Sequence, residues 1–180
     1  MQITLVRHGQ TDYNNAKILQ GVSNIPLNDT GRKQAATLKE KLKDTNFDIC
    51  FSSPLIRAME TAMILVGDRV EIIRDDRLIE RNMGQLEGKD VSLYNPKKYW
   101  DYNLNSNDLD VESIQTIFKR CEEFLSYISE KYKDKSVLVV SHGAVTRALH
   151  HIISNTDKNS NMLKFKVDNC FCETLEYKDK

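Results

Sequence analysis

The chain has 180 residues, in which 26 Lys and Arg balance 26 Asp and Glu, and 40% of the residues are hydrophobic. These values suit one globular domain, residues 1–180, that can bury a core without disulfides or metal ions. Neither a nucleic-acid partner nor a membrane partner is expected, because the charge is balanced and no apolar segment approaches the ~20 residues of a membrane helix.

The cysteines and the amino terminus indicate the expected compartment. The four cysteines lie inside apolar patterns without the CxxC spacing of zinc or redox sites: Cys50, Cys121, Cys170 and Cys172. Free buried thiols in a reducing compartment are the simplest interpretation. The chain also begins with a predicted strand rather than with the pattern of a signal peptide. We therefore expect a cytoplasmic protein.

The first predicted element is a buried strand over residues 3–6, which stops at Arg7 and His8. A continuous apolar run followed by glycine is typical of a parallel sheet. Ligands of open α/β sheets bind outside the carboxyl ends of the strands, so Arg7 and His8 are expected to face a ligand. The long polar segment 10–26 is expected to form one wall of the pocket. Its candidate substrate-binding residues include Gln20 and Gly21.

The next predicted elements are a helix over 30–43, a strand over 47–52 and a second helix that ends near residue 66. Ser53 is expected to cap the second helix, with proline at its first position. Arg57 then lies in the first turn, where backbone amides, the helix dipole and a guanidinium all favour a bound phosphate.

A third strand is predicted over 70–74, and the chain then leads to Glu80. Segment 88–110 has no clear period and carries three tyrosines and the single tryptophan, so we interpret it as an irregular cap over the site. A surface insertion without a ligand role is the alternative. Asp110 is expected to cap a long helix that ends near residue 132, with apolar residues at helical spacing.

A second apolar run, 136–141, ends on His142 and Gly143 as the first run ends on a histidine and a glycine. If the two strands are neighbours, His8 and His142 meet in one pocket. A helix over 143–153 follows.

A terminal pair of strands is predicted over 162–167 and 170–177. Strands that alternate with helices predict an α/β fold with a mainly parallel sheet and helices on both faces.

The expected pocket contains two guanidiniums, two imidazoles and one carboxyl group, from Arg7, Arg57, His8, His142 and Glu80. This set suits a dianionic substrate, whereas acyl transfer would require a serine elbow that the chain lacks. Two arginines can grip phosphoryl oxygens while a neutral histidine attacks the phosphorus. Glu80 could protonate the leaving alkoxide and later accept a proton from water.

Other phosphate chemistries fit less well. A cysteine phosphatase requires Cys-x5-Arg, and the spacing from Cys50 to Arg57 is one residue too long. Asp108 and Asp110 imitate an aspartyl phosphatase pair but follow no buried strand. Segment 84–89 is not a P-loop, because it has one residue too few between its glycines and lacks the Ser or Thr that binds magnesium. No metal site is expected.

Four motifs resemble those of the histidine phosphatase superfamily, phosphoglycerate mutase branch: 5–11 with Asn14, 53–58 with Thr61 and Ala62, 78–80 with Gly84 and 87–88, and 141–143. The resemblance spans residues 3–177 and keeps the order of the family. It implies a three-layer α/β/α fold without metal or cofactor. It also implies that His8 is the phosphorylated nucleophile, that Arg7, Arg57 and His142 bind the phosphate, and that Glu80 donates a proton. Asn14 resembles a loop asparagine that helps to hold the phosphoryl group, and Gly143 joins the substrate-binding candidates.

Departures from the mutase pattern favour a phosphatase, similar to the α-ribazole phosphatases. Mutases of this branch carry two adjacent arginines in a longer insertion. In this chain Arg120 is the single arginine of segment 89–134. The expected partner is a small-molecule phosphate ester, such as a sugar phosphate, a nucleotide-like phosphate or phosphoserine; a phosphoprotein also fits. Mutase-type phosphoryl transfer and a non-catalytic phosphate-binding module are the alternatives.

Overall fold

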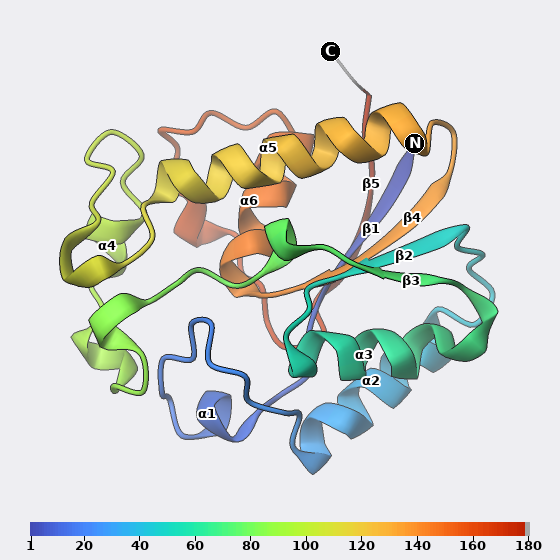
Figure 1. The fold of residues 1–180 in the computed structure, drawn as a ribbon, viewed down its shortest axis with the longest axis horizontal. Coiled ribbons are helices and arrows are strands. Elements are labelled where there is room, and N and C mark those ends of the chain that lie inside the picture. The colour runs from blue at the N-terminus through green and yellow to red at the C-terminus, as the bar shows by residue number, and fades with distance from the viewer. Residues whose placement is uncertain (179–180) are drawn as a thin grey trace.

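A computed structural model describes residues 1–178 (Figure 1). Five strands form one sheet in the order β3-β2-β4-β1-β5. β1, β2, β3 and β4 are parallel, and β5 pairs antiparallel with β1. The strands are β1 Gln2–Arg7, β2 Ile49–Ser52, β3 Ile72–Arg74, β4 Ser136–Ser141 and β5 Cys172–Glu176.

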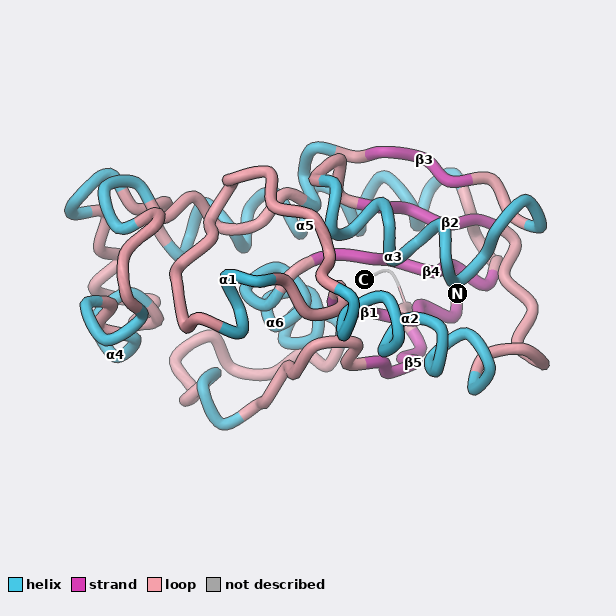
Figure 2. The backbone as a smooth tube through the Cα atoms, turned by 90° about the horizontal axis from the view of Figure 1, so that it is seen from below, coloured by secondary structure: helices cyan, strands magenta, loops and turns pink. Residues whose placement is uncertain are grey.

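Helices cover both faces of this sheet. α2 Asp29–Lys41 and α3 Ile56–Val66 lie on one face, and α5 Ile114–Lys131 and α6 Gly143–Ile153 lie on the other (Figures 1 and 2). Side chains of a strand alternate between the faces. Phe51 of β2 therefore packs in the core with α5, whereas its neighbour Cys50 packs in the core with α3. The predicted α/β fold is confirmed.

The order of the strands creates a crevice between β1 and β4. After β1, the chain crosses one face of the sheet through α2 and continues to β2, toward the edge formed by β3. After β4, it crosses the other face through α6 and continues to β5, which forms the opposite edge. Neighbouring strands whose connections diverge in this way form a topological switch point, where ligands of open α/β sheets bind.

The loops contain short helices that the sequence analysis did not predict. α1 Asp12–Asn15 begins at Thr11, whose hydroxyl accepts from the backbone N–H of Asn14 at 3.2 Å. Segment 88–110 folds into α4 Pro96–Tyr99 and two 3-10 turns. It also contains Trp100, which is only 9% exposed and belongs to the core beneath α5.

Two predicted helix caps are wrong. α3 starts two residues later than expected, at Ile56, and its N-cap Leu55 makes no side-chain cap. α5 is capped by Ser113 rather than by Asp110, and the Ser113 hydroxyl accepts from the N–H of Thr116 at 3.3 Å. Asp110 instead ends a 3-10 turn with a φ of 60°.

The predicted terminal strand pair is also wrong in its first half. Residues 162–164 form a 3-10 turn, and only β5 joins the sheet. The backbone carbonyls of Phe165 and Val167 accept hydrogen bonds from Arg147 and Arg7. Phe165 and Val167 thus bind arginine side chains with the carbonyls that would otherwise pair with a neighbouring strand.

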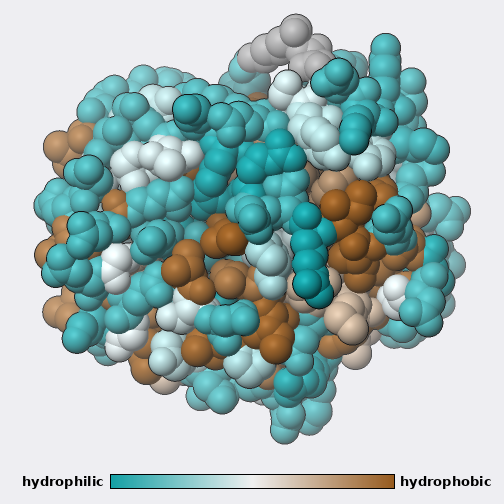
Figure 3. Space-filling model, viewed as in Figure 1, coloured by the Kyte–Doolittle hydropathy of each residue, from teal (hydrophilic) through white to brown (hydrophobic). Residues whose placement is uncertain are grey.

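The face seen in Figure 1 is mainly hydrophilic, and its hydrophobic areas are separated by polar ones (Figure 3). Single exposed apolar side chains are normal for a folded domain. Within residues 1–178, no helix has both the length and the apolar character needed to span a bilayer.

Candidate active site

The carboxyl ends of β1 and β4 bring His8 and His142 together. Arg7 pairs with Ser141 in the parallel register, so the next residue of each strand enters the same crevice. The backbone N–H of His8 donates to the Ser141 carbonyl at 2.9 Å. The two imidazole rings lie 5.1 Å apart between centroids, and both are buried. The predicted meeting of the two histidines is therefore confirmed.

The environment of His8 leaves one ring nitrogen free for nucleophilic attack. Nδ1 lies 2.6 Å from the Gly9 carbonyl, which can only accept, so Nδ1 carries the proton and Nε2 carries a lone pair. Burial lowers the pKa of His8 well below its usual value, and the guanidiniums of Arg7 and Arg57 lower it further. The imidazole is thus neutral at neutral pH, as a histidine nucleophile requires.

Backbone carbonyls, rather than carboxylates, hold the two arginines beside His8. Arg57 is buried and donates through Nη1 to Ser23 O at 2.7 Å and through Nη2 to Gly21 O at 2.8 Å. Arg7 donates through Nη1 to Val167 O at 2.6 Å. Within residues 1–178, neither arginine forms an ion pair. Their positive charges therefore remain available to an anion.

Ser53 orients His142. Its hydroxyl lies 2.7 Å from His142 Nε2, and it also accepts from the backbone N–H of Leu55 at 3.3 Å. Because the hydroxyl accepts from Leu55, its proton is free to point to Nε2, and on this basis we assign the proton of His142 to Nδ1. Burial lowers the pKa of His142 well below its usual value, and the charge of Arg57 adds to this effect.

Three buried nitrogens around His8 have no hydrogen-bond partner among residues 1–178: Arg7 Nε, Arg57 Nε and His142 Nδ1. A buried donor without an acceptor costs about 1–3 kcal/mol, and a charged one costs more. Three such donors, contributed by β1, α3 and the end of β4, therefore mark a built site for an anion.

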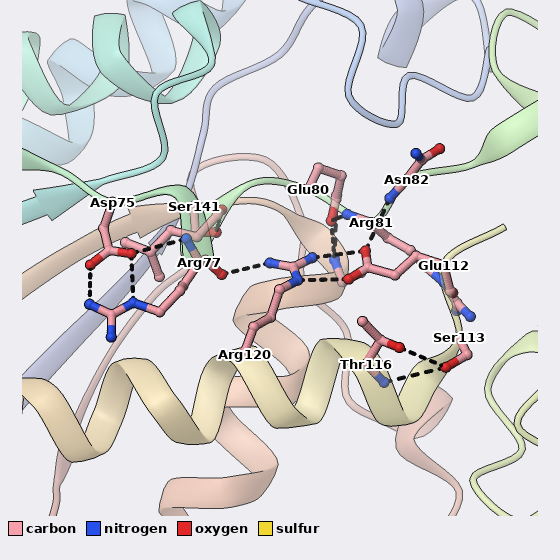
Figure 4. A network of polar contacts seen from close by, with 12 residues as sticks. Asp75, Arg77, Glu80, Arg81, Asn82, Glu112, Ser113, Thr116, Arg120 and Ser141 are labelled. Carbon is pink, nitrogen blue, oxygen red and sulfur yellow. Dashed lines mark hydrogen bonds and ion pairs between the residues drawn. The ribbon is translucent and has the colours of Figure 1, made fainter. Parts of the chain in front are cut away.

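Glu80 lies on the same side of the pocket, at the amino end of α6. Its Oε1 accepts from the N–H of Arg81 at 2.9 Å and from that of Ala144 at 3.2 Å. A Cβ added to Gly143 would lie 3.7 Å from both Glu80 Oε2 and Arg7 Nε, so these groups face the same small space. The segment that carries Glu80 is bound to α5 by Arg120 and Glu112 (Figure 4). A cavity of about 320 Å³ reaches Glu80 from the solvent side.

Comparisons with known proteins agree with this geometry. The profile of the histidine phosphatase superfamily (branch 1) matches residues 3–180. The chain belongs to this superfamily. It is 33% identical over 177 residues to the metal-independent phosphoserine phosphatase of Arabidopsis thaliana, covering 93% of this chain and 74% of the relative.

Solved structures place this phosphatase in the same fold. A phosphoserine phosphatase from Entamoeba histolytica, in complex with phosphoserine, superposes with a TM-score of 0.83 at 28% identity and covers 96% of this chain and 89% of its own. The α-ribazole phosphatase of Shigella flexneri superposes with a TM-score of 0.83 at 27% identity, covering 98% and 90%. The expected similarity to α-ribazole phosphatases is thus confirmed at the level of family and fold.

The phosphatase uses the remaining predicted site residues mainly in the wall around the arginines and His8. Asn14 Oδ1 accepts from Asn169 Nδ2 at 3.1 Å, and the same amide donates to the His8 carbonyl at 3.2 Å. Gln20 is buried and accepts from the Thr11 hydroxyl at 2.8 Å. Gly21 holds Arg57 through its carbonyl.

Sequence reasoning missed Ser53 as a partner of His142, and it left Arg147 on α6 without a role. A signal for Arg147 was present, because it follows Gly143 by four residues and so lies on the same face of the helix. No comparable signal existed for Ser53, whose contact joins residues 89 positions apart. Within residues 1–178, no three His, Cys, Asp or Glu side chains are grouped to hold a metal ion.

Proposed function

We propose that this phosphatase hydrolyses small phosphomonoesters without a metal ion, through a phosphohistidine on His8. The observation that carries the proposal is the set of three buried, unpartnered donors on Arg7, Arg57 and His142 around a neutral imidazole. Charge-assisted donors of this kind bind phosphoryl oxygens and stabilise the charge that spreads over them during transfer.

In the first step, His8 Nε2 attacks the phosphorus and the ester P–O bond breaks. Glu80, which faces the same space as Arg7 Nε, protonates the leaving alkoxide. The proton on His8 Nδ1 stays in its hydrogen bond to the Gly9 carbonyl, which stabilises the positive charge of the phosphorylated ring.

In the second step, water attacks the phosphohistidine and gives a proton to Glu80. The P–N bond breaks, so His8 becomes neutral again and inorganic phosphate leaves. Glu80 thus ends the cycle in the protonated form in which it began, as microscopic reversibility requires.

Trapping the intermediate tests this proposal. After mixing with a ³²P-labelled phosphate ester and rapid quenching, the wild type is expected to carry acid-labile, alkali-stable label. His8→Ala should carry none, whereas His150→Gln, which changes a histidine outside the site, should keep the label. EDTA should not change the rate. Absence of label in the wild type would favour a non-catalytic binding module, and release of the label to phosphoglycerate rather than to water would favour a mutase.

A further inference from the structure

A third arginine, Arg147, lies beside the phosphoryl site. It follows Gly143 by four residues of α6, a rise of about 6 Å along the helix. Its Nε donates to the Phe165 carbonyl at 3.1 Å, while Arg7 Nη1 donates to the Val167 carbonyl at 2.6 Å. Residues two apart in a chain are separated by at most about 7 Å. One short segment, 165–167, therefore holds both Arg7 and Arg147.

The two terminal nitrogens of the Arg147 guanidinium are free to bind a ligand. Apart from the bond of Nε to Phe165, the guanidinium has no hydrogen bond or ion pair with residues 1–178. Burial lowers the pKa of Arg147, and the charges of Glu80 and Arg7 act on it in opposite directions, so these groups lie near one another. Because neither Arg147 nor Arg7 forms an ion pair with a carboxylate among residues 1–178, a bound anion is favoured beside them.

Segment 88–110 contacts this arginine. The ring of Trp100 lies 4.8 Å from Arg147 Cζ, a distance at which an aromatic ring attracts a cation. Trp100 is itself nearly buried, and Tyr94 of the same segment binds Arg81 Nη1 through its hydroxyl at 3.1 Å. The contact with Trp100 and the bond to Phe165 thus restrict the orientation of Arg147 before a ligand binds, which reduces the entropy lost on binding.

We propose that Arg147 forms a second anion subsite that binds a carboxylate of the substrate, so that the enzyme prefers phosphomonoesters with a carboxylate a few bonds from the ester oxygen. This inference rests on the proposed function. A carboxylate fits better than a second phosphate, because one guanidinium edge matches a monoanion in a paired hydrogen bond. The phosphoryl site, by comparison, uses two arginines for a dianion.

Two esters that differ only in the carboxylate test the subsite: O-phospho-L-serine and O-phosphoethanolamine. For the wild type, kcat/KM should be about 10- to 100-fold higher for phosphoserine, the range expected for a charged hydrogen-bond pair. In Arg147→Met this ratio should fall to near 1, with an intermediate ratio in Arg147→Lys. The matched control is Arg69→Met, since Arg69 also donates to backbone carbonyls but lies in the turn after α3. It should keep the wild-type ratio.

Binding measurements separate the subsite from the chemistry. In His8→Ala, calorimetry should show tighter binding of phosphoserine than of phosphoethanolamine, and adding Arg147→Met should remove the difference. This arm decides the inference even if no ester is hydrolysed, an outcome that would refute only the proposed function. Equal affinity for the two esters, or an equal loss for both in Arg147→Met, would overturn the subsite. A preference for a bisphosphate over its monophosphate, without a preference for phosphoserine, would overturn the assignment to a carboxylate.

Discussion

Arg120 and Glu112 form a two-pronged ion pair, with Nε 2.8 Å from Oε1 and Nη2 3.0 Å from Oε2 (Figure 4). Arg120 also donates to the Arg77 carbonyl at 2.6 Å, and Glu112 accepts from the Asn82 N–H at 3.2 Å. The pair thus binds the backbone on both sides of Glu80. We infer that Arg120 of α5 and Glu112, just before α5, position Glu80, the proposed proton donor.

Replacing Arg120 with Met should therefore impair proton transfer as well as stability. We expect the single-turnover rate of phosphohistidine formation from an alkyl phosphate to fall about 10-fold, a part of the usual gain from general acid catalysis. With p-nitrophenyl phosphate, whose leaving group hardly requires a proton, the rate should fall less. The free energy of unfolding should decrease by about 3 kcal/mol, because Glu112 loses its partner at a nearly buried position.

Arg77→Met provides the matched control for Arg120→Met. Arg77 forms a similar ion pair with Asp75 at 2.5 Å and also contacts α5, through the Glu123 carbonyl. Its side chain does not bind the residues after Glu80. An equal dependence on the leaving group in both variants would show that Arg120 acts only on stability.

Ser53→Ala should weaken phosphate binding, because the Ser53 hydroxyl orients the proton of His142 toward the site. Loss of one such hydrogen bond predicts an increase of about 10-fold in the Kd for inorganic phosphate, measured by calorimetry. Ser52→Ala is the control, since the buried Ser52 hydroxyl donates to the Ser53 carbonyl and contacts no histidine. If both variants bind phosphate like the wild type, Ser53 does not set the tautomer.

The stability of the protein should fall as the pH decreases below about 6.5. Burial lowers the pKa of His8 and of His142 in the folded state, so the unfolded chain binds protons first. Each histidine then contributes a loss of up to about 1.4 kcal/mol per pH unit, whereas above pH 6.5 its contribution is constant. Urea unfolding at pH 7.5 and 5.5 measures the loss. His8→Gln should show a smaller loss than the wild type, and an equal loss would contradict the prediction.

Two glycines should respond differently to substitution by alanine. A Cβ on Gly143 would lie 3.7 Å from its nearest neighbours, an ordinary contact, so Gly143→Ala should fold but occupy the space between Arg7 and Glu80. We expect a more than 10-fold lower kcat/KM with little change in thermal stability. A Cβ on Gly31 would lie 2.1 Å from the Gln10 carbonyl, so Gly31→Ala should lose stability by about 2 kcal/mol or more. Circular dichroism melts and steady-state kinetics separate the two effects.

The candidate site could be predicted to a large extent because its residues stand at the ends of apolar runs. Such runs form buried strands wherever they lie, and the carboxyl ends of parallel strands share one edge of the sheet. The predicted helix over 143–153 also agrees with α6, because an apolar stripe and a following polar segment are local features. Arg7, His8 and His142 could thus be singled out from the sequence.

Capping was decided by tertiary contacts. Ser53 has the local chemistry of a helix cap, but its hydroxyl pairs with His142 across the crevice, and the helix begins later. Near α5, Glu112 pairs with Arg120, and Ser113 rather than Asp110 becomes the cap. A propensity worth about 1 kcal/mol is easily outweighed by such contacts.

Periodicity within single segments therefore predicted the five strands of the sheet and its four long helices, because this signal is local. Long-range packing, by contrast, places β4 beside β1, attaches Arg147 and Arg7 to one segment, and lets Arg120 hold the segment of Glu80. These relationships join residues that are far apart in the chain. The strand order and the packing of α5 and α6 against the sheet create them, and no local pattern encodes either.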